Sequence, residues 1–207
     1  MAVAVTRVLN PQFGQNCYAV QSSEEAADAV IIDPGGDPAP LLELGVDVAA
    51  ILVTHTDIDH VLGVADLHRA TGAEVWVPAG EADVLRTGAA RAGGGVPPHD
   101  PEHLVGDGDW VRAAGLELEV VGIPGHSIDH VAYCVDGALF SGDLLFASSV
   151  GRVDLPGGDW ETLIASIRRL LDRFGPDAAV YPGHGEPTTL GRELESNPFL
   201  GELRTGG

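Results

Sequence analysis

The sequence contains no lysine, and all eleven of its basic residues are arginine. Aspartate and glutamate number 31, so the formal net charge of the 207-residue chain is −20. A protein that binds nucleic acid or an anionic membrane needs clustered basic residues that neutralise phosphate groups. The charge balance therefore argues against nucleic acid and anionic membranes as partners. It favours a well-solvated acidic surface.

Cysteine is scarce as well, and Cys17 and Cys134 both lie in apolar, strand-like runs. Two thiols in such surroundings are typical of buried structural residues rather than of a disulfide. No apolar run is long enough to span a bilayer. Residues 1–10 also lack a charged-then-apolar leader with a cleavage site. We therefore expect a cytoplasmic protein without a signal peptide.

The length and the composition are typical of one globular domain, expected over residues 1–207. Hydrophobic residues make up 44% of the chain and charged residues 20%, which allows a sizeable core. Strand-like runs alternate with helical patterns in two similar halves, and the clearest amphipathic helix is predicted at 162–174. This alternation predicts an α/β layered sandwich. Segment 87–101 has no periodicity and is expected to be an irregular loop.

The stretch 51–60, ILVTHTDIDH, is the centre of the chain's organisation. Its first four residues read as a buried strand, and a polar cluster of two imidazoles and two carboxylates follows at once. These side chains are His55, Asp57, Asp59 and His60. Alone, such a cluster is equally compatible with a solvated turn.

Three later segments repeat this arrangement of a strand-like run, a glycine and a metal-ligand type. They are Pro124-Gly125-His126, Ser141-Gly142-Asp143 and Pro182-Gly183-His184. Four strand ends that converge with His and Asp form a metal site far more easily than four unrelated turns do. We therefore predict a metal centre built from these four segments.

This combination resembles the metallo-β-lactamase superfamily, whose pattern is His-x-His-x-Asp-His followed by a His, an Asp and a last His. Further stretches resemble its short, single-domain glyoxalase II-like hydrolases. They are VIIDPGGD (30–37), SGDLLF (141–146), GRVDLPGGD (151–159), YPGHGEPTTLGRE (181–193) and NPFL (197–200). The resemblance covers nearly the whole chain and implies the four-layer αβ/βα sandwich, with metals at one edge of two sheets. It also implies that the C-terminal helical domain of longer glyoxalase II relatives is absent.

If the family's ligands are carried over, the resemblance implies two divalent metal ions, with zinc first and iron or manganese as alternatives. The first set would be His55, Asp57 and His126, and the second Asp59, His60 and His184. Asp143 would bridge the two ions. Two cations that share a water lower its pKa, so hydroxide would serve as the nucleophile. Asp59 would also be catalytic, because it could orient that hydroxide and move its proton.

Asp57 departs from the family pattern, which has a histidine at this position. Two interpretations remain open: Asp57 folds aside and accepts a hydrogen bond from a ligand histidine, or it binds the first metal. A coordinating carboxylate would favour harder ions such as iron or manganese over zinc. The superfamily's diiron flavoproteins carry a carboxylate at the same place.

The resemblance implies a hydrolase of a small-thiol thioester, acting on a small-molecule substrate. One alternative is an oxygenase like the persulfide dioxygenases, whose mononuclear iron trio matches His55, His126 and Asp143. The other is a non-catalytic relative that only binds a metal or a ligand. Arg152 could hold a substrate carboxylate, or it could pair with Asp154 or Asp159 instead. The thiol, the acyl group and the oligomeric state stay open.

Overall fold

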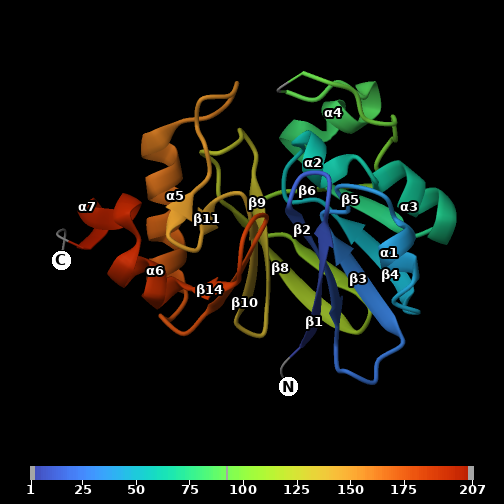
Figure 1. The fold of residues 1–207 in the computed structure, drawn as a ribbon, viewed down its shortest axis with the longest axis horizontal. Helices are drawn as coiled ribbons and strands as arrows, with labels where there is room; N and C mark the ends of the chain where they lie inside the picture. The colour runs from blue at the N-terminus through green and yellow to red at the C-terminus, as the bar shows by residue number, and fades with distance from the viewer. Residues whose placement is uncertain (1–2, 92, 205–207) are drawn as a thin grey trace.

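The computed structural model describes residues 3–91 and 93–204, and it contains two six-stranded sheets (Figure 1). The first sheet has the order β1-β2-β3-β4-β5-β6. Its strands are β1 (Ala4–Asn10), β2 (Gln15–Gln21), β3 (Asp28–Ile32), β4 (Asp47–Leu52), β5 (Glu74–Pro78) and β6 (His103–Val105). The pairs β1/β2 and β2/β3 are antiparallel, whereas β3, β4, β5 and β6 run parallel. The central strand β4 is therefore enclosed between two parallel neighbours.

The second sheet has the order β14-β13-β10-β9-β8-β7. Its strands are β7 (Trp110–Ala113), β8 (Leu116–Gly122), β9 (Val131–Val135), β10 (Ala138–Gly142), β13 (Ala179–Pro182) and β14 (Thr188–Thr189). Only β10 and β13 pair in parallel. A small additional hairpin pairs β11 (Leu145–Phe146) with β12 (Ser149–Val150). Because β10 and β13 are parallel neighbours, their carboxyl ends lie at the same edge of the sheet.

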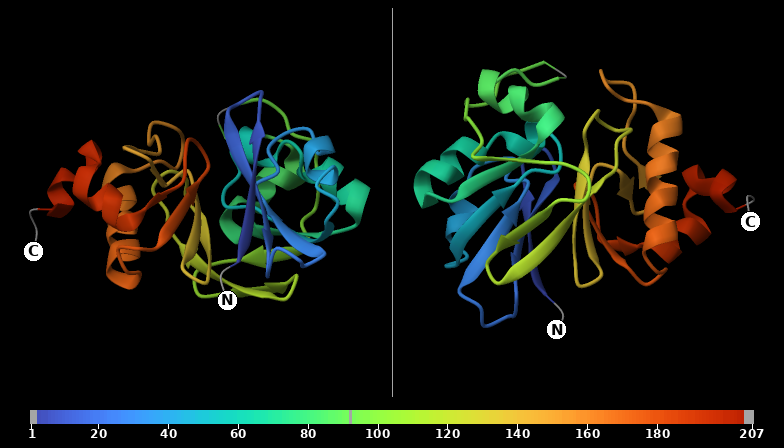
Figure 2. Two further views of the ribbon diagram at one scale, coloured as in Figure 1. Left: turned by 60° about the horizontal axis from the view of Figure 1, so that its bottom comes forward. Right: turned by 180° about the vertical axis from the view of Figure 1, so that it is seen from behind.

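Helices cover the outer face of each sheet (Figures 1 and 2). The first sheet carries α1 (Ala39–Leu42), α2 (Ile58–Val61), α3 (Val64–Thr71), η1 (Ala79–Glu81) and α4 (Ala82–Thr87). The second carries α5 (Trp160–Arg173), α6 (Leu190–Ser196), η2 (Pro198–Leu200) and α7 (Gly201–Arg204). The longest helix, α5, begins after Asp159, whose carboxylate accepts the Thr162 backbone N–H at 2.8 Å.

Three hydrophobic clusters fill the spaces between these layers, one between the sheets and one under each helical layer. The central cluster also contains two buried tyrosines that tie the sheets together. The Tyr18 hydroxyl donates to the Pro182 carbonyl at 2.7 Å, and the Tyr133 hydroxyl donates to the Val53 carbonyl at 3.0 Å. Both carbonyls lie at strand ends that lead into the polar cluster, so these bonds fix the two sheets relative to one another there.

The four-layer αβ/βα sandwich predicted from the sequence is confirmed. The predicted helix at 162–174 is α5, shifted by two residues at its start. Sequence patterns did not predict α2 or the short strand β6. Cys17 and Cys134 are both buried and free, as expected. Within the described ranges, no helix is long and apolar enough to cross a membrane.

Candidate metal centre

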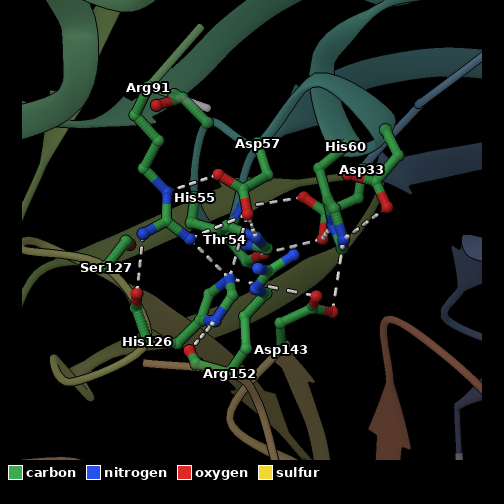
Figure 3. A network of polar contacts seen from close by, with 12 residues as sticks. Asp33, Thr54, His55, Asp57, His60, Arg91, His126, Ser127, Asp143 and Arg152 are labelled. Atoms are coloured by element: carbon green, nitrogen blue, oxygen red, sulfur yellow. Dashed lines mark hydrogen bonds and ion pairs between the residues drawn. The ribbon is translucent and has the colours of Figure 1, made fainter. Parts of the chain in front are cut away.

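The four polar segments predicted to converge do meet at one edge of the two sheets. Figure 3 shows three of them there, with His60, His126 and Asp143 close together. His55 follows β4, His126 follows β8, Asp143 follows β10 and His184 follows β13. Asp59 and His60 belong to the short helix α2 just after β4. Because β4 belongs to the first sheet and the other three strands to the second, the site is formed between the two halves of the chain.

The second predicted ligand set lies within a small volume. The Nε2 atom of His184 is 3.0 Å from Oδ2 of Asp59, and His60 Nε2 is 3.9 Å from the same oxygen. Donor atoms of these three residues all lie within 4.8 Å of one another. Nitrogen and oxygen ligands sit about 2.0–2.2 Å from a zinc ion, so donors of one set lie within about 4 Å of each other. The second set is compact enough to hold one ion.

Asp143 lies between the two predicted sets. Its Oδ1 is 3.3 Å from His60 Nε2, and its Oδ2 is 3.6 Å from His184 Nε2. The same Oδ2 is 3.9 Å from Nε2 of His126, which belongs to the first set. One carboxylate therefore reaches donors of both sets, as a bridging ligand must.

Hydrogen bonds orient three of the histidines with Nε2 toward the centre. His60 Nδ1 lies 2.9 Å from Asp33 Oδ2, and His126 Nδ1 lies 2.8 Å from the Arg152 carbonyl oxygen. The Thr54 hydroxyl donates to Asp33 at 2.7 Å, so it can only accept the Nδ1–H of His55 at 3.0 Å. In the neutral form of each ring, Nδ1 carries the proton and Nε2 can present its lone pair to the site. Metal-ligating histidines are held in this way by an acceptor behind the ring.

The donor chemistry of the site fits metal ions. Among the described residues, three buried polar atoms at its centre have no hydrogen-bond partner: His55 Nε2, His60 Nε2 and Asp143 Oδ1. A buried polar atom without a partner costs free energy unless something satisfies it. Imidazole nitrogens and carboxylate oxygens are ligands for zinc and for iron. These His and Asp clusters are consistent with a binuclear metal site.

The first predicted set is also brought together, but an arginine enters it. Asp57 Oδ2 is 3.1 Å from His126 Nε2 and 3.8 Å from His55 Nε2. Arg91, from the segment after α4, contacts both carboxylate oxygens of Asp57, with Nη2 at 2.7 Å from Oδ2. Its Nη2 also lies 2.8 Å from His126 Nε2. The guanidinium is thus part of the site, whereas no sequence pattern pointed to it.

The charged groups of the first set shift each other's pKa. Burial opposes ionisation of Asp57, but the bidentate contact with the Arg91 guanidinium outweighs it and holds the pKa of this carboxyl well below its usual range. Burial lowers the pKa of His55, and the neighbouring histidines lower it further. Asp57 is therefore ionised and His55 neutral at pH 7, which are the forms that bind a cation.

Three other residues near the centre have well-defined contacts. Arg152 pairs with Asp154 at 2.6 and 2.7 Å, and its side chain is 60% exposed. Substrate binding by Arg152 stays a prediction. The Ser127 hydroxyl donates to Glu81. His130 is fully buried, and the centroid of its ring lies 4.6 Å from that of His55.

Asp33 and Glu81 are supporting residues that sequence reasoning missed. Asp33 accepts hydrogen bonds from Thr54 and contacts His60, so one carboxylate orients two ligand histidines. Glu81 accepts from the backbone N–H and the hydroxyl of Thr56 at 2.8 and 2.9 Å, and from Ser127. Asp33 follows an apolar strand directly, and this signal is the same one that identified His55.

Comparison with known proteins matches residues 10–184 to the family model described as the metallo-β-lactamase superfamily. The chain belongs to this superfamily. Hydroxyacylglutathione hydrolase GloC of Haemophilus influenzae is 36% identical over 203 residues, covering 91% of this chain and 93% of the relative. A solved structure of TTHA1623 in a di-iron-bound form is 40% identical, with a TM-score of 0.79, and covers 95% of this chain and 100% of that one. The BLEG-1 B3 metallo-β-lactamase is 30% identical, with a TM-score of 0.87, and covers 96% and 100%.

These findings make the chain a metal-dependent hydrolase of the metallo-β-lactamase fold. The resemblance stated from the sequence is therefore confirmed at the level of the superfamily. Relatives named hydroxyacylglutathione hydrolase agree with the glyoxalase II-like character of its motifs.

A third cluster of donor atoms lies outside the metallo-β-lactamase centre. His68, His99 and Glu102 bring three ligand atoms within 4.8 Å of one another. Glu102 also accepts the Val75 backbone N–H at 2.8 Å, and the two imidazole rings are 4.4 Å apart. Any experiment that counts metal ions must separate this cluster from the predicted centre.

We expect metal binding to the second set to release protons at neutral pH. The hydrogen bond to Asp59 raises the pKa of His184 above its usual value. Burial opposes the charged form of His60, but Asp143 and Asp33 raise its pKa as well. An ion binds only neutral imidazole, so it competes with these protons, and affinity rises with pH through and above about 6.5. Calorimetric titration in two buffers of different ionisation enthalpy measures the release.

The matched control for this titration is His103→Gln. His103 also contacts a carboxylate, that of Glu74 at 2.7 Å, but it lies outside the centre. We expect proton release per bound ion to be the same in this variant and in the parent. A metal affinity that does not change between pH 6 and 8 would contradict the prediction.

Proposed function

We propose that the chain hydrolyses a thioester of a small thiol. The observation that carries this proposal is the complete second set, Asp59, His60 and His184, with Asp143 placed to bridge it to the first. Donor atoms of Asp59, His60 and His184 lie within 4.8 Å of one another, and Asp143 Oδ1 lies 3.3 Å from His60 Nε2. Relatives that are named hydroxyacylglutathione hydrolase and cover most of the chain support the same class of substrate.

Asp59, His60, Asp143 and His184 would hold an ion, with zinc as first choice and iron or manganese as alternatives. A bound ion supplies a water of lowered pKa and polarises a carbonyl oxygen. His60 is fully buried, whereas the side chain of Asp59 is 18% exposed. Asp59 is therefore the carboxylate of this set that an entering molecule can reach.

Asp59 would orient the attacking water and carry its proton toward the leaving group. Its Oδ2 is 3.0 Å from His184 Nε2, and this contact lowers the pKa of Asp59 despite its burial. An ionised carboxylate only accepts protons, so it would act as a general base at neutral pH. A thiolate leaving group needs little protonation, since thiols have a pKa near 8.5. Cleavage of a thioester therefore depends less on a proton donor for the leaving group than cleavage of an amide does.

The arrangement of Arg91 argues against the persulfide oxygenase interpretation. That chemistry would use His55, His126 and Asp143 as the ligands of one iron. Arg91 Nη2 lies 2.8 Å from His126 Nε2, so it uses the lone pair that this trio needs. The second set has no such competitor among the described residues. This contrast favours the ligands of a hydrolase.

The test is to measure cleavage and oxygen uptake separately. We expect release of thiol from an acyl-thioester series under nitrogen, followed with a thiol-reactive chromophore, and loss of that release on chelation. We expect no oxygen uptake with a persulfide in air, measured with an oxygen electrode. Oxygen uptake with persulfide and no anaerobic cleavage would rule the hydrolase proposal out in favour of the oxygenase. No turnover in either assay would favour a non-catalytic relative.

A further inference from the structure

Arg91 lies in the centre, but it matches no position of the family pattern and has no role in the proposed catalytic step. Its side chain is only 11% exposed, although the described residues of its segment, 88–91 and 93–102, form no regular helix or strand. The guanidinium forms a bidentate pair with Asp57, and the distance from Nη2 to Oδ2 is 2.7 Å. Figure 3 shows it opposite Asp57 and beside His126.

Every N–H group of this guanidinium has an acceptor. Nε and Nη2 donate to Asp57, Nη2 also contacts His126 Nε2 at 2.8 Å, and Nη1 donates to the His126 carbonyl at 2.8 Å and the Pro156 carbonyl at 3.3 Å. A guanidinium has five N–H donors and no acceptor, so all five are satisfied here. A fully satisfied, largely buried arginine is a built part of the site rather than a side chain resting on its surface.

The contact with His126 takes a lone pair that a metal would need. Because an arginine nitrogen can only donate, His126 Nε2 must accept, and its proton lies on Nδ1 toward the Arg152 carbonyl at 2.8 Å. Both oxygens of Asp57 are occupied by the same guanidinium. Of the first set, only His55 Nε2 has no partner among the described residues.

Charge leads to the same conclusion. A guanidinium and a divalent cation repel each other strongly when both lie within a few ångströms in a partly buried site. Asp57 is paired with an arginine, whose charge is permanent. Among the described residues, the ion-pair partners of Asp59 and Asp143 are histidines and not an arginine. An ion at the second set therefore meets no fixed positive charge, whereas an ion at the first set does.

We propose that Arg91 is a built-in competitor of the first metal ion: its guanidinium takes the place of that ion against Asp57 and His126. The second set then fills first and tightly. The first set fills only when the guanidinium leaves Asp57 and His126. The departure at residue 57 follows from this arrangement, because a carboxylate pairs with a guanidinium and the family's histidine would not.

The test is a zinc titration of the metal-stripped protein, with stoichiometry and affinity read by calorimetry and by elemental analysis after gel filtration. We expect one tight equivalent in the parent chain and a second that binds at least tenfold more weakly. Arg91→Ala should bind the second equivalent at least tenfold more tightly than the parent does. Arg91→Gln, which keeps the length of the side chain but not its charge, should do the same and decides the matter if the alanine variant folds poorly.

Three controls separate this inference from others. Arg86→Gln removes an exposed arginine of α4 that pairs with Asp83 and Asp100, and it should leave both affinities unchanged. Each protein is also prepared with the additional substitution His99→Ala and titrated again. An ion bound by the third cluster is then not counted. In the parent, His184→Ala should remove the tight equivalent, whereas His55→Ala should keep it.

The inference fails if the parent and both Arg91 variants bind two equivalents with the same affinities. It also fails if His55→Ala, rather than His184→Ala, removes the tight equivalent. Neither result depends on substrate, so the thioester proposal can fail while this inference stands. Absence of any bound metal in all proteins would overturn both.

Discussion

Asp143→Asn should lower the affinity of the protein for its metal at least about 100-fold and its hydrolytic rate by a larger factor. Partners that only orient metal ligands contribute about 10–100-fold in affinity, and Asp143 is placed as a ligand itself. Its two oxygens lie 3.3 Å from His60 Nε2 and 3.6 Å from His184 Nε2. An asparagine keeps the shape of the side chain and one oxygen but removes the charge.

Thermal unfolding with and without zinc measures this effect independently of any substrate. A ligand that binds only the folded chain stabilises that chain, and the stabilisation grows with the logarithm of the ratio of ligand concentration to Kd. A 100-fold weaker Kd therefore removes about 2.7 kcal/mol of stabilisation at saturating metal. For a domain of this size the shift in Tm is about 5–10 °C. We expect this shift in the zinc-loaded protein and a much smaller one in the stripped protein.

Asp66→Asn is the matched control, because Asp66 is exposed on α3 and pairs with Arg69 at 2.6 Å. It should change neither metal affinity nor the zinc-dependent shift in Tm. If Asp143→Asn and Asp66→Asn gave the same metal content, Asp143 would not be a ligand and the assignment of both sets would be wrong.

The fold and most of the candidate centre could be predicted from the sequence because their signals are local. A buried strand that ends at a polar cluster gives a recognisable sequence pattern within six residues. Four such patterns identified the ends of β4, β8, β10 and β13. The register of parallel strands then brings those ends to one edge. His55, Asp59, His60, His126, Asp143 and His184 lie together there, as the motifs indicated, while their role as metal ligands stays a prediction.

Arg91 could not be predicted in this way because its partners are distant in sequence and its own segment has no periodicity. Its contacts reach Asp57 and His126, 34 and 35 residues away. Two weak signals were nevertheless present. Arg91 is the only charged residue between 87 and 98, and Asp57 breaks the family pattern by adding a negative charge. An unexplained charge near a predicted centre is a reason to look for its counter-charge elsewhere in the chain.

The short strand β6 and the supporting carboxylate of Glu81 were missed for a related reason. β6 has three residues and pairs with β5 at the edge of the described sheet. A strand of this length is too short to show an alternating pattern. Glu81 is a charged residue in a helical turn and would be expected on the surface. It is buried because Thr56 and Ser127 supply donors to both of its oxygens. Such pairings arise from tertiary packing and leave no periodic trace.

Gly183→Ala should abolish tight metal binding and lower the stability of the folded chain, although a glycine carries no chemistry. A Cβ added at Gly183 would lie 2.1 Å from Asp143 Oδ1 and 2.6 Å from His60 Cε1. Atoms that are not bonded to each other do not approach this closely. Because the predicted bridging oxygen and a ligand ring are the two neighbours, any relief of the clash moves a metal ligand.

The backbone at Gly183 has little room to move instead. Its N–H donates to the Gly142 carbonyl at 2.8 Å, and its carbonyl accepts the Asn16 N–H at 2.7 Å. These bonds hold the segment against β10 on one side and β2 on the other. We expect a loss of at least about 2 kcal/mol in the free energy of unfolding, the usual scale for overpacking, and thus a Tm about 4–8 °C lower.

Gly175→Ala is the control, since no atom lies within 4 Å of a Cβ at this exposed position. Its Tm and its zinc stoichiometry should equal those of the parent chain. Circular dichroism of Gly183→Ala should show the parent's secondary structure below its Tm, because the clash is confined to the edge where the sheets meet. Full zinc affinity in a folded Gly183→Ala protein would mean that His60 and Asp143 can move apart without cost. The close packing of His60, Asp143 and Gly183 would then not be what positions these two side chains.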